Sequence, residues 1–233
     1  MPVTAEHDET DVLANPVWSA LNGDHTSLAR VHGHARIYDP EVSVFGGMPS
    51  EPPAEAWADL AALLGPEDGV VVVGTSIRLP EGWEALRVIE GMQFVESGVE
   101  GGLTDDIVAL GEADAVEMLA LAERTRPGPF LSGTVRLGGY VGIRDAGRLV
   151  AMAGRRMRPD GWIEVSAVCT DEGYRGRGMG ARLVRAVVQG IHQEGRRAFL
   201  HVEKGNDGAI GLYRKLGFET SRDMTFLFTR PVA

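Results

Sequence analysis

Glycines and arginines alternate just before a stretch with helical apolar spacing in the second half of the chain. Within the segment GYRGRGMG, Gly176, Gly178 and Gly180 are interleaved with Arg175 and Arg177. Glycine lets the backbone adopt positive φ and approach a ligand closely, and the unpaired N–H groups of a helix N-terminus attract anions. Arginine adds charge-assisted hydrogen bonds to anionic oxygens. This spacing predicts a site for a pyrophosphate, and a glycine-rich connection without a ligand is the competing interpretation.

Two common phosphate-binding patterns do not fit this segment. No Gly-Lys-Ser/Thr follows it, as a Walker loop requires, and the Rossmann spacing G-x-G-x-x-G is absent. Basic residues are nevertheless concentrated here, because six arginines lie within 23 residues that contain one acid, Glu194. They are Arg175, Arg177, Arg182, Arg185, Arg196 and Arg197. The cluster favours a local anionic ligand.

A second pattern follows downstream in the segment NDGAIGLYRKLGF. Its members have the spacing N-x-x-A-x-x-x-Y-x-x-x-G-F and are Asn206, Ala209, Tyr213, Gly217 and Phe218. Together with R-x-x-G-x-G in the glycine segment, this pattern resembles the GNAT superfamily of N-acetyltransferases. The resemblance covers roughly residues 101–233. The segments EVSAVCT and FLHV resemble one branch of it, in which the substrates are mostly undefined small amines or amino acids.

The resemblance implies acetyl-CoA as cosubstrate and assigns its contacts. The backbone of Val168, Cys169 and Thr170 would pair with the pantetheine arm like an added strand. Loop N–H groups would hold the pyrophosphate, arginines would supply charge, and the start of the next helix would contact the arm. The residues assigned in this way are Arg175, Gly176, Arg177, Gly178, Gly180, Asn206, Ala209 and Tyr213. The Val168 N–H would also bind the oxyanion that forms when the amine attacks the thioester directly.

The loop departs from the family pattern at its entrance. Where the family often has a proline, this chain has Asp171, Glu172 and Gly173. Two acids close to an anion site are expected to weaken the binding of the coenzyme, because like charges repel.

Acetyl transfer to an amine needs two proton transfers, because an ammonium has no lone pair and the departing thiolate gains from protonation. Tyr213 matches the family tyrosine that acts as the acid toward sulfur, with a packing residue as its competing interpretation. For the base we choose Glu164, because alternation along residues 161–170 would put its side chain on the face of Val168. His201 competes with Glu164 for this role, and so does Glu203. Glu164 would also suit an anchor for the substrate ammonium, and a solvated strand glutamate or a structural ion pair is its competing interpretation.

Periodicity and turn residues predict the elements that position these groups. We expect strands over 105–111, 161–170, 197–203 and 221–230, and a hairpin over 140–157 that turns at residues 145–147. Helices are expected over 112–126, 180–194 and 207–217. The fold class predicted is therefore α/β with a mixed sheet (α+β), and the resemblance implies the GNAT acyltransferase fold for residues 99–233.

The first part of the chain differs in charge from the rest. Residues 1–100 carry 4 Arg and 17 Asp plus Glu, a balance of −13, whereas residues 101–233 carry +3 of the total of −10. A helix over 54–65 and a strand over 69–74 are expected in it. We predict a smaller α/β domain over residues 1–98, compatible with a degenerate GNAT-like copy that binds no coenzyme. Its acidity could steer a cationic amine, improve solubility or form a dimer surface.

Composition excludes several other classes of protein. With 44% hydrophobic and 24% charged residues and no apolar run near 20 residues, a soluble protein without membrane contact is expected. The acidic chain is a poor nucleic-acid binder. Cys169 is the single cysteine and the first residues lack a secretory pattern, so the cytoplasm is the expected compartment. No metal is expected, because His32 and His34 have no Cys or acidic cluster beside them.

The function predicted is acetyl transfer from acetyl-CoA to a primary amine of a small molecule or amino acid. A catalytically silent acyl-CoA-binding sensor and a transferase that uses a longer acyl donor are the alternatives. The partner expected is a small-molecule amine, and the chain could also form a homodimer. The identity of the amine does not follow from the sequence.

Overall fold

The computed structural model describes residues 11–232, which contain a mixed sheet of eleven strands in the order β1-β2-β3-β4-β11-β5-β10-β9-β8-β7-β6. The strands are β1 (Ala29–His32), β2 (Ala35–Tyr38), β3 (Phe45–Gly47), β4 (Val70–Gly74), β5 (Trp83–Glu96), β6 (Ile107–Leu110), β7 (Tyr140–Asp145), β8 (Arg148–Arg155), β9 (Trp162–Thr170), β10 (Arg197–Glu203) and β11 (Phe218–Pro231). The helices are α1 (Pro16–Asn22), α2 (Ala56–Ala62), α3 (Ala115–Thr125), α4 (Met179–Gln193) and α5 (Asp207–Leu216). The predicted mixed α/β class is confirmed. The prediction about a secretory start rests on the first residues, which lie outside the described part.

Two layers of helices enclose the sheet in the C-terminal half. The apolar face of α4, which includes Leu183 and Val187, packs with α5 on Ile163 and Val165 of β9. On the opposite face, α3 packs on β8 and β9, where Cys169 lies in its cluster. Burial of these apolar faces is the main force that holds helices of this length on a sheet.

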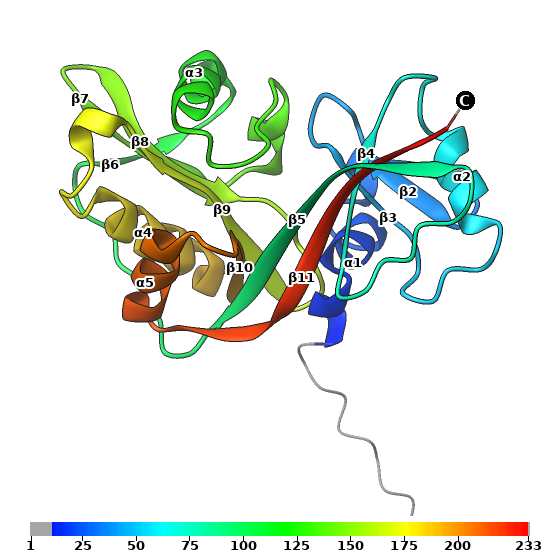
Figure 1. Ribbon diagram of the computed structural model, residues 1–233. Helices are drawn as coiled ribbons and strands as arrows, with labels where there is room; N and C mark the ends of the chain where they lie inside the picture. Colours follow the sequence, from blue (N-terminus) through cyan, green and yellow to red (C-terminus); the bar gives the residue numbers. More distant parts are fainter. Residues whose placement is uncertain (1–10, 233) are drawn as a thin grey trace, which may run out of the picture.

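The long strands β5 and β11 connect the two halves of the molecule. Figure 1 shows them crossing together from the half with α3, α4 and α5 to the half with α1 and α2. β11 pairs with β4 and along the length of β5, while residues 91–95 of β5 pair with β10. The predicted domain boundary after residue 98 falls just beyond β5 and stays a prediction, but strand pairing crosses it.

The core also crosses this boundary. Leu13, Val17 and Leu21 at the start of the chain pack in one cluster with Trp162 and Phe199 from the strands of the C-terminal half. The N-terminal half therefore covers the face of β9 and β10 that lies opposite α4 and α5.

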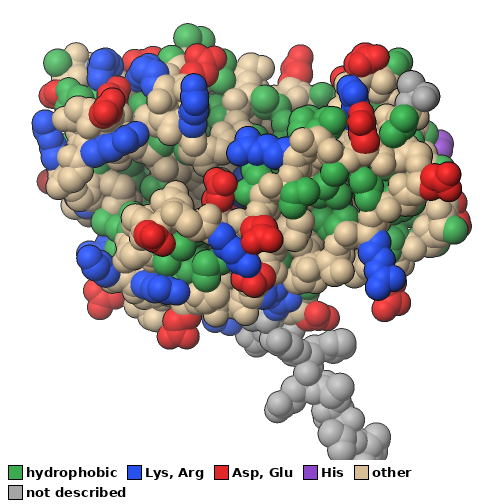
Figure 2. Space-filling view, viewed as in Figure 1, with side chains coloured by type: hydrophobic (Ala, Val, Ile, Leu, Met, Phe, Trp, Pro, Cys, Tyr) green, Lys and Arg blue, Asp and Glu red, His purple; other side chains and the backbone are tan. Residues whose placement is uncertain are grey.

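An exposed apolar area lies on the part of β5 and β11 that runs beside β4. Figure 2 shows hydrophobic side chains gathered to the right of the middle of this face, where β5 and β11 run into the half with α1 and α2. Exposed hydrophobic residues of these two strands are Leu86, Val88 and Phe228. The homodimer stays a prediction.

Candidate functional site

β9 and β10 run parallel, but they stay paired only at one end. Their paired residues run from Trp162 and Arg197 to Glu164 and Phe199, although β9 continues to Thr170. Beyond Glu164 no strand of the described residues pairs with this edge of β9. A backbone edge without a strand partner leaves N–H and C=O groups that an extended ligand can bind. The predicted pairing of a pantetheine arm with residues 168–170 requires such an edge.

A bulge interrupts β9 inside this stretch. Cys169 lies opposite Met152, whereas Ser166 lies opposite Gly154, so β9 carries one more residue than β8 between these pairs. Ala167 has φ of 52°, a left-handed conformation that is uncommon for a residue with a Cβ. One extra residue shifts the alternation of side chains by one position.

The shift corrects one prediction from the sequence. Val168 packs with α4 and α5, but Glu164 lies on the opposite face, in contact with Arg156. The prediction that Glu164 and Val168 share a face is therefore wrong, because strict alternation does not hold across the bulge at Ala167.

The glycine segment forms the start of α4 as predicted. Gly176 has φ of 77°, and Gly178, the residue before α4, has φ of 73°, so both adopt the left-handed conformation that glycine favours. No side chain caps the first turn of α4. A Cβ added at either glycine would have no neighbour within 4 Å. The N–H groups of this turn are therefore accessible to a ligand.

Gly180 lies inside the first turn of α4, where no unusual φ requires a glycine. A Cβ added there would come no closer than 3.8 Å to Val168 Cγ1 and 3.9 Å to Leu212, which are ordinary contacts. Glycine inside a helix costs about 1 kcal/mol relative to alanine. The protein's own packing therefore does not explain why this position is a glycine.

The charges around the loop favour an anion. Arg175 and Arg177 are exposed and have no carboxylate partner within residues 11–232. Asp171, which the sequence suggested would repel a coenzyme, is instead flanked by Arg124 at 3.3 Å and Arg148 at 2.9 Å. The entrance therefore carries more positive charge than the sequence alone indicated.

Three of the six clustered arginines lie away from the loop or pair with acids. Arg182 pairs with Asp106, and Arg196 lies 3.1 Å from Asp24. Arg197 stacks on Trp162 at 4.2 Å. The local anionic site therefore depends on fewer arginines than the cluster suggested.

The second motif forms α5, beside α4. Asn206 caps this helix by accepting a hydrogen bond from the Ala209 N–H at 3.1 Å. Tyr213 is buried in the cluster against which Val168 packs, and its ring meets Phe218 edge-on. Burial, with a smaller contribution from the charge of Glu164, raises the pKa of Tyr213 to about 12. Tyr213 and Val168 therefore belong to the same face of the sheet.

Glu164 is fully buried and has several partners. Arg156 donates to both of its oxygens, from Nε at 2.8 Å and from Nη2 at 2.6 Å. His201 Nδ1 lies 2.7 Å from Oε1, and the Met157 N–H donates to Oε2 at 3.3 Å. Burial alone would raise the pKa of Glu164, but the charge and hydrogen bonds of Arg156, helped by His201, lower it to about 2. Its oxygens are occupied and the side chain has no exposed surface.

His201 is held on both sides of its ring. Gln93 Nε2 lies 3.0 Å from His201 Nε2 and also donates to the Leu13 carbonyl at 2.8 Å. Since Gln93 Nε2 is a donor, His201 Nε2 accepts and its Nδ1 carries the proton donated to Glu164. His201 is therefore a buried histidine with a partner at each ring nitrogen, which agrees with a structural role and leaves neither nitrogen free to act as a base.

Arg156 is the residue of this network that the sequence analysis missed. A usable signal existed, because β8 and β9 form a hairpin in which Arg155 lies opposite Val165. Extending that register by one residue toward the turn places Arg156 opposite Glu164. The turn predicted from the sequence, at residues 145–147, joins β7 to β8, whereas the turn that brings Arg156 opposite Glu164 lies between β8 and β9.

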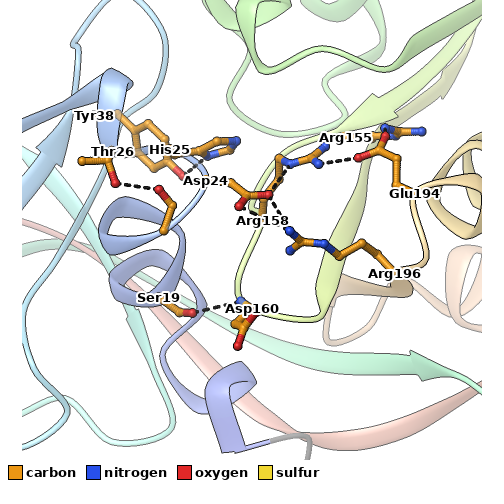
Figure 3. Close-up of polar contacts among 11 residues, drawn as sticks. Ser19, Asp24, His25, Thr26, Tyr38, Arg155, Arg158, Asp160, Glu194 and Arg196 are labelled. Carbon is orange, nitrogen blue, oxygen red and sulfur yellow. Dashed lines mark hydrogen bonds and ion pairs between the residues drawn. The ribbon is translucent and has the colours of Figure 1, made fainter.

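A second charged cluster lies where the two halves meet. Figure 3 shows Arg158 between Asp24 and Glu194, with Arg155 also directed at Glu194 and Arg196 at Asp24. Arg158 donates to Asp24 at 3.1 Å and to Glu194 at 2.5 Å. These contacts join the loop after β8 and the end of α4 to the N-terminal half.

A surface cavity of about 470 Å³ opens beside this cluster. Its lining includes Trp18, Asp24, Arg158 and Asp160. None of the site residues expected from the sequence lines it, so it is separate from the glycine loop.

The remaining candidates have ordinary structural roles. His32 lies 3.8 Å from Asp59 and His34 lies 3.8 Å from Glu55, and residues 11–232 contain no group of three metal-ligating side chains. Cys169 is buried, and burial raises the pKa of its thiol, which makes it unreactive. In the same part of the chain, no helix is long and apolar enough to cross a membrane.

Comparison with known proteins gives consistent similarities. A family model described as FR47-like protein matches residues 140–227. The chain is similar to the crystal structure of a GNAT-family protein from Novosphingobium aromaticivorans, with 41% identity and a TM-score of 0.88 over 95% of this chain and 99% of that chain.

Curated relatives match less than half of the chain. N-alpha-acetyltransferase RimI of Mycobacterium tuberculosis is 41% identical over 83 residues, 34% of this chain and 51% of that protein. L-methionine sulfoximine/L-methionine sulfone acetyltransferase of Pseudomonas aeruginosa is 33% identical over 103 residues, 43% of this chain and 57% of that protein. The chain thus spans about half the length of these curated relatives.

Proposed function

Because the chain belongs to the GNAT family, which it matches over nearly its whole length in one solved structure, we propose that it transfers an acetyl group from acetyl-CoA to a primary amine. The observation that carries this proposal is the combination of the parted strands β9 and β10 with an open glycine loop at the start of α4. The free edge of β9 would bind the extended pantetheine arm, and the glycine loop would bind the pyrophosphate that follows the arm in the same coenzyme molecule.

The loop residues then have separate tasks. The backbone of residues 168–170 pairs with the pantetheine arm, and N–H groups from Gly176 to Gly180 hold the pyrophosphate, assisted by the charges of Arg175 and Arg177. Asn206 and Ala209 line the arm from α5. The Val168 N–H stabilises the oxyanion, and a preorganised donor of this kind contributes on the order of 3 kcal/mol to catalysis.

Tyr213 protonates the departing thiolate, the attacking nitrogen loses its proton to water, and water returns a proton to Tyr213. Its pKa of about 12 keeps the hydroxyl protonated at neutral pH, so the proton is available when the C–S bond breaks. Its place in the same cluster as Val168 supports this role.

For Glu164 we propose a positioning role in place of the base role. A carboxylate with a pKa of about 2, no exposure and both oxygens bonded has a weak tendency to take a proton from an amine. Its ion pair fixes Arg156, while its bond to His201 fixes the ring. The competing interpretation of Glu164 as a structural ion pair agrees with this geometry.

The sensor remains the second candidate function, because the same burial of Glu164 and His201 favours it. A protein that binds acetyl-CoA but lacks an accessible base would hold the coenzyme without turnover. The names of the relatives describe different acceptors, an N-alpha amine in one and methionine sulfoximine or sulfone in another. A small amine is therefore the acceptor class we propose. The glycine loop does not discriminate between acyl groups of different length, so a longer acyl donor remains an alternative to acetyl-CoA.

The test is release of free CoA thiol from acetyl-CoA by the purified chain, with and without a panel of amines. Acetyl transfer predicts thiol release that depends on the amine, together with a product heavier by one acetyl group. Binding of acetyl-CoA without release under every amine would favour the sensor and contradict the transferase.

A further inference from the structure

Arg156 is only partly satisfied by its ion pair. Its Nε and Nη2 donate to Glu164, but Nη1 donates no hydrogen bond to any side chain or carbonyl of residues 11–232. The side chain of Arg156 keeps 14% of its exposure, whereas that of Glu164 keeps none. Within residues 11–232 the buried polar side-chain atoms without a partner are Gln93 Oε1 and Arg155 Nε, so the unpaired Nη1 of Arg156 is not fully buried and a ligand can reach it.

The surroundings of Arg156 come from both halves of the molecule. Its guanidinium lies 4.9 Å from the ring centre of Phe45 in β3, and buried Tyr38 and Tyr140 are near enough for its charge to affect their pKa values. Its partner Glu164 is the last residue of β9 that pairs with β10. Arg156 is thus held beside the point where the two strands part, on the face opposite the glycine loop.

This placement matters because the coenzyme and the amine must reach one carbonyl from different directions. The glycine loop and Tyr213 lie on the α4 and α5 side of the sheet, as does Val168. The N-terminal half covers much of the opposite face, and the 14% of the Arg156 side chain that stays exposed is where an acceptor on that side would meet the protein.

We propose that Arg156 Nη1 binds a carboxylate of the acceptor, so that the acceptor is an amino acid or another small amine that carries one carboxylate. This inference rests on the acetyl transfer proposed above. Arg156 is then a specificity-determining residue, and Glu164 positions it by holding the other two nitrogens.

Charge balance favours an amino acid over other amines. Arg156 and Glu164 cancel each other, so a site built on them suits a ligand without net charge, such as an ammonium paired with a carboxylate. A simple amine would leave Nη1 without an acceptor, and a desolvated donor without a partner is unfavourable. A phosphate would bring two negative charges toward Glu164, which is also unfavourable.

The test compares acceptors that differ only at the carboxylate. L-methionine, L-methioninamide and 3-(methylthio)propylamine form one such set, and L-leucine, L-leucinamide and isopentylamine form another. The account predicts that kcat/KM for the acid exceeds that for its amide by about 10- to 100-fold, the range for one charge-assisted hydrogen bond. Equal rates, or a preference for the amide or amine, would overturn it.

A variant of Arg156 tests whether the preference for a carboxylate depends on this residue. Arg156→Lys can keep the ion pair with Glu164 but loses the separate third nitrogen. It should raise KM for the acid about 10-fold or more and leave KM for the amide and the Kd of acetyl-CoA within about twofold. Arg158→Lys, in the ion pairs with Asp24 and Glu194, is the matched control and should change neither KM. Equal losses for acid and amide in Arg156→Lys would mean that Arg156 is only structural.

The outcomes separate this inference from the proposed function. Transfer to amides and plain amines with no preference for acids contradicts the inference and leaves the acetyltransferase in place. No transfer to any acceptor contradicts both. If Arg156→Lys does not fold, the comparison of acid with amide in the wild-type protein still decides.

Discussion

Arg156 and Glu164 form a two-point ion pair, with separations of 2.8 and 2.6 Å, in the core where the N-terminal half meets the sheet. The pair joins the end of β8 to the last paired residue of β9, so it fixes the geometry at the point where β9 and β10 part. A pair with so few exposed atoms depends on its own hydrogen bonds to offset the loss of hydration.

Breaking this pair from one side should be strongly destabilising. Arg156→Met leaves Glu164 as a buried charge without its main partner, so we expect a loss of about 3–5 kcal/mol in the free energy of unfolding, measured by urea denaturation. The double variant Arg156→Met/Glu164→Leu should recover most of that loss. The exposed pair of Lys204 and Asp223, 3.0 Å apart, is the control, and Lys204→Met should change stability by at most about 1 kcal/mol. A double variant no more stable than Arg156→Met would contradict this account.

His25 should make stability depend on pH between about 4 and 6.5. Burial, aided by the charge of Arg158, lowers the pKa of His25 from 6.5 to about 4 in the folded protein. Between these values the unfolded chain binds the proton and the folded protein does not, so stability falls as pH falls through this range. The slope from one group is at most about 1.4 kcal/mol per pH unit.

The variant that checks this is His25→Gln, because glutamine can keep a hydrogen bond to the Tyr38 hydroxyl, which lies 2.7 Å from His25 Nδ1. Urea midpoints of the two proteins at pH 7, 5.5 and 4.5 should converge as pH falls. A constant difference across the series would show that His25 does not titrate in this way.

Tyr213→Phe should separate catalysis from binding. The change removes the hydroxyl that is protonated at neutral pH but leaves the ring packed on Phe218, so kcat should fall by about 100-fold. The Kd of acetyl-CoA should change by less than about twofold, since the ring remains. Unaltered kcat in steady-state thiol release would remove Tyr213 from the role of acid.

The local features of this fold could be predicted from the sequence. The glycine segment before α4 and the capped helix α5 depend on neighbouring residues, and the structure has both where they were expected. Gly217, expected at the end of α5, adopts φ of 98° there. Local backbone conformation of this kind can be inferred from residue types alone.

Features that depend on distant strands were not predicted. The bulge at Ala167 has no glycine to mark it, and it follows from the register between β8 and β9. The network of Gln93, His201 and Glu164 requires the order β5-β10-β9, which brings together residues from three separate segments. Burial of the candidate bases thus depends on tertiary packing, and the alternation of residues along one strand could not predict it.

The central claim is that the glycines of the loop hold the coenzyme, and Gly180→Ala tests it most directly. Alanine fits the protein at this position and is a better helix former, so the variant should unfold a few degrees higher than the wild type. Gly211→Ala is the matched control, because it makes the same change inside a helix. Gly211 lies two residues from Tyr213 and about 200° around α5, so it faces away from the proposed site.

We would measure the Kd of acetyl-CoA calorimetrically for these three proteins. The account predicts micromolar binding to the wild type and to Gly211→Ala, and binding at least about 10-fold weaker to the more stable Gly180→Ala. Equal affinity of Gly180→Ala and the wild type would contradict the assignment of the loop to the coenzyme pyrophosphate.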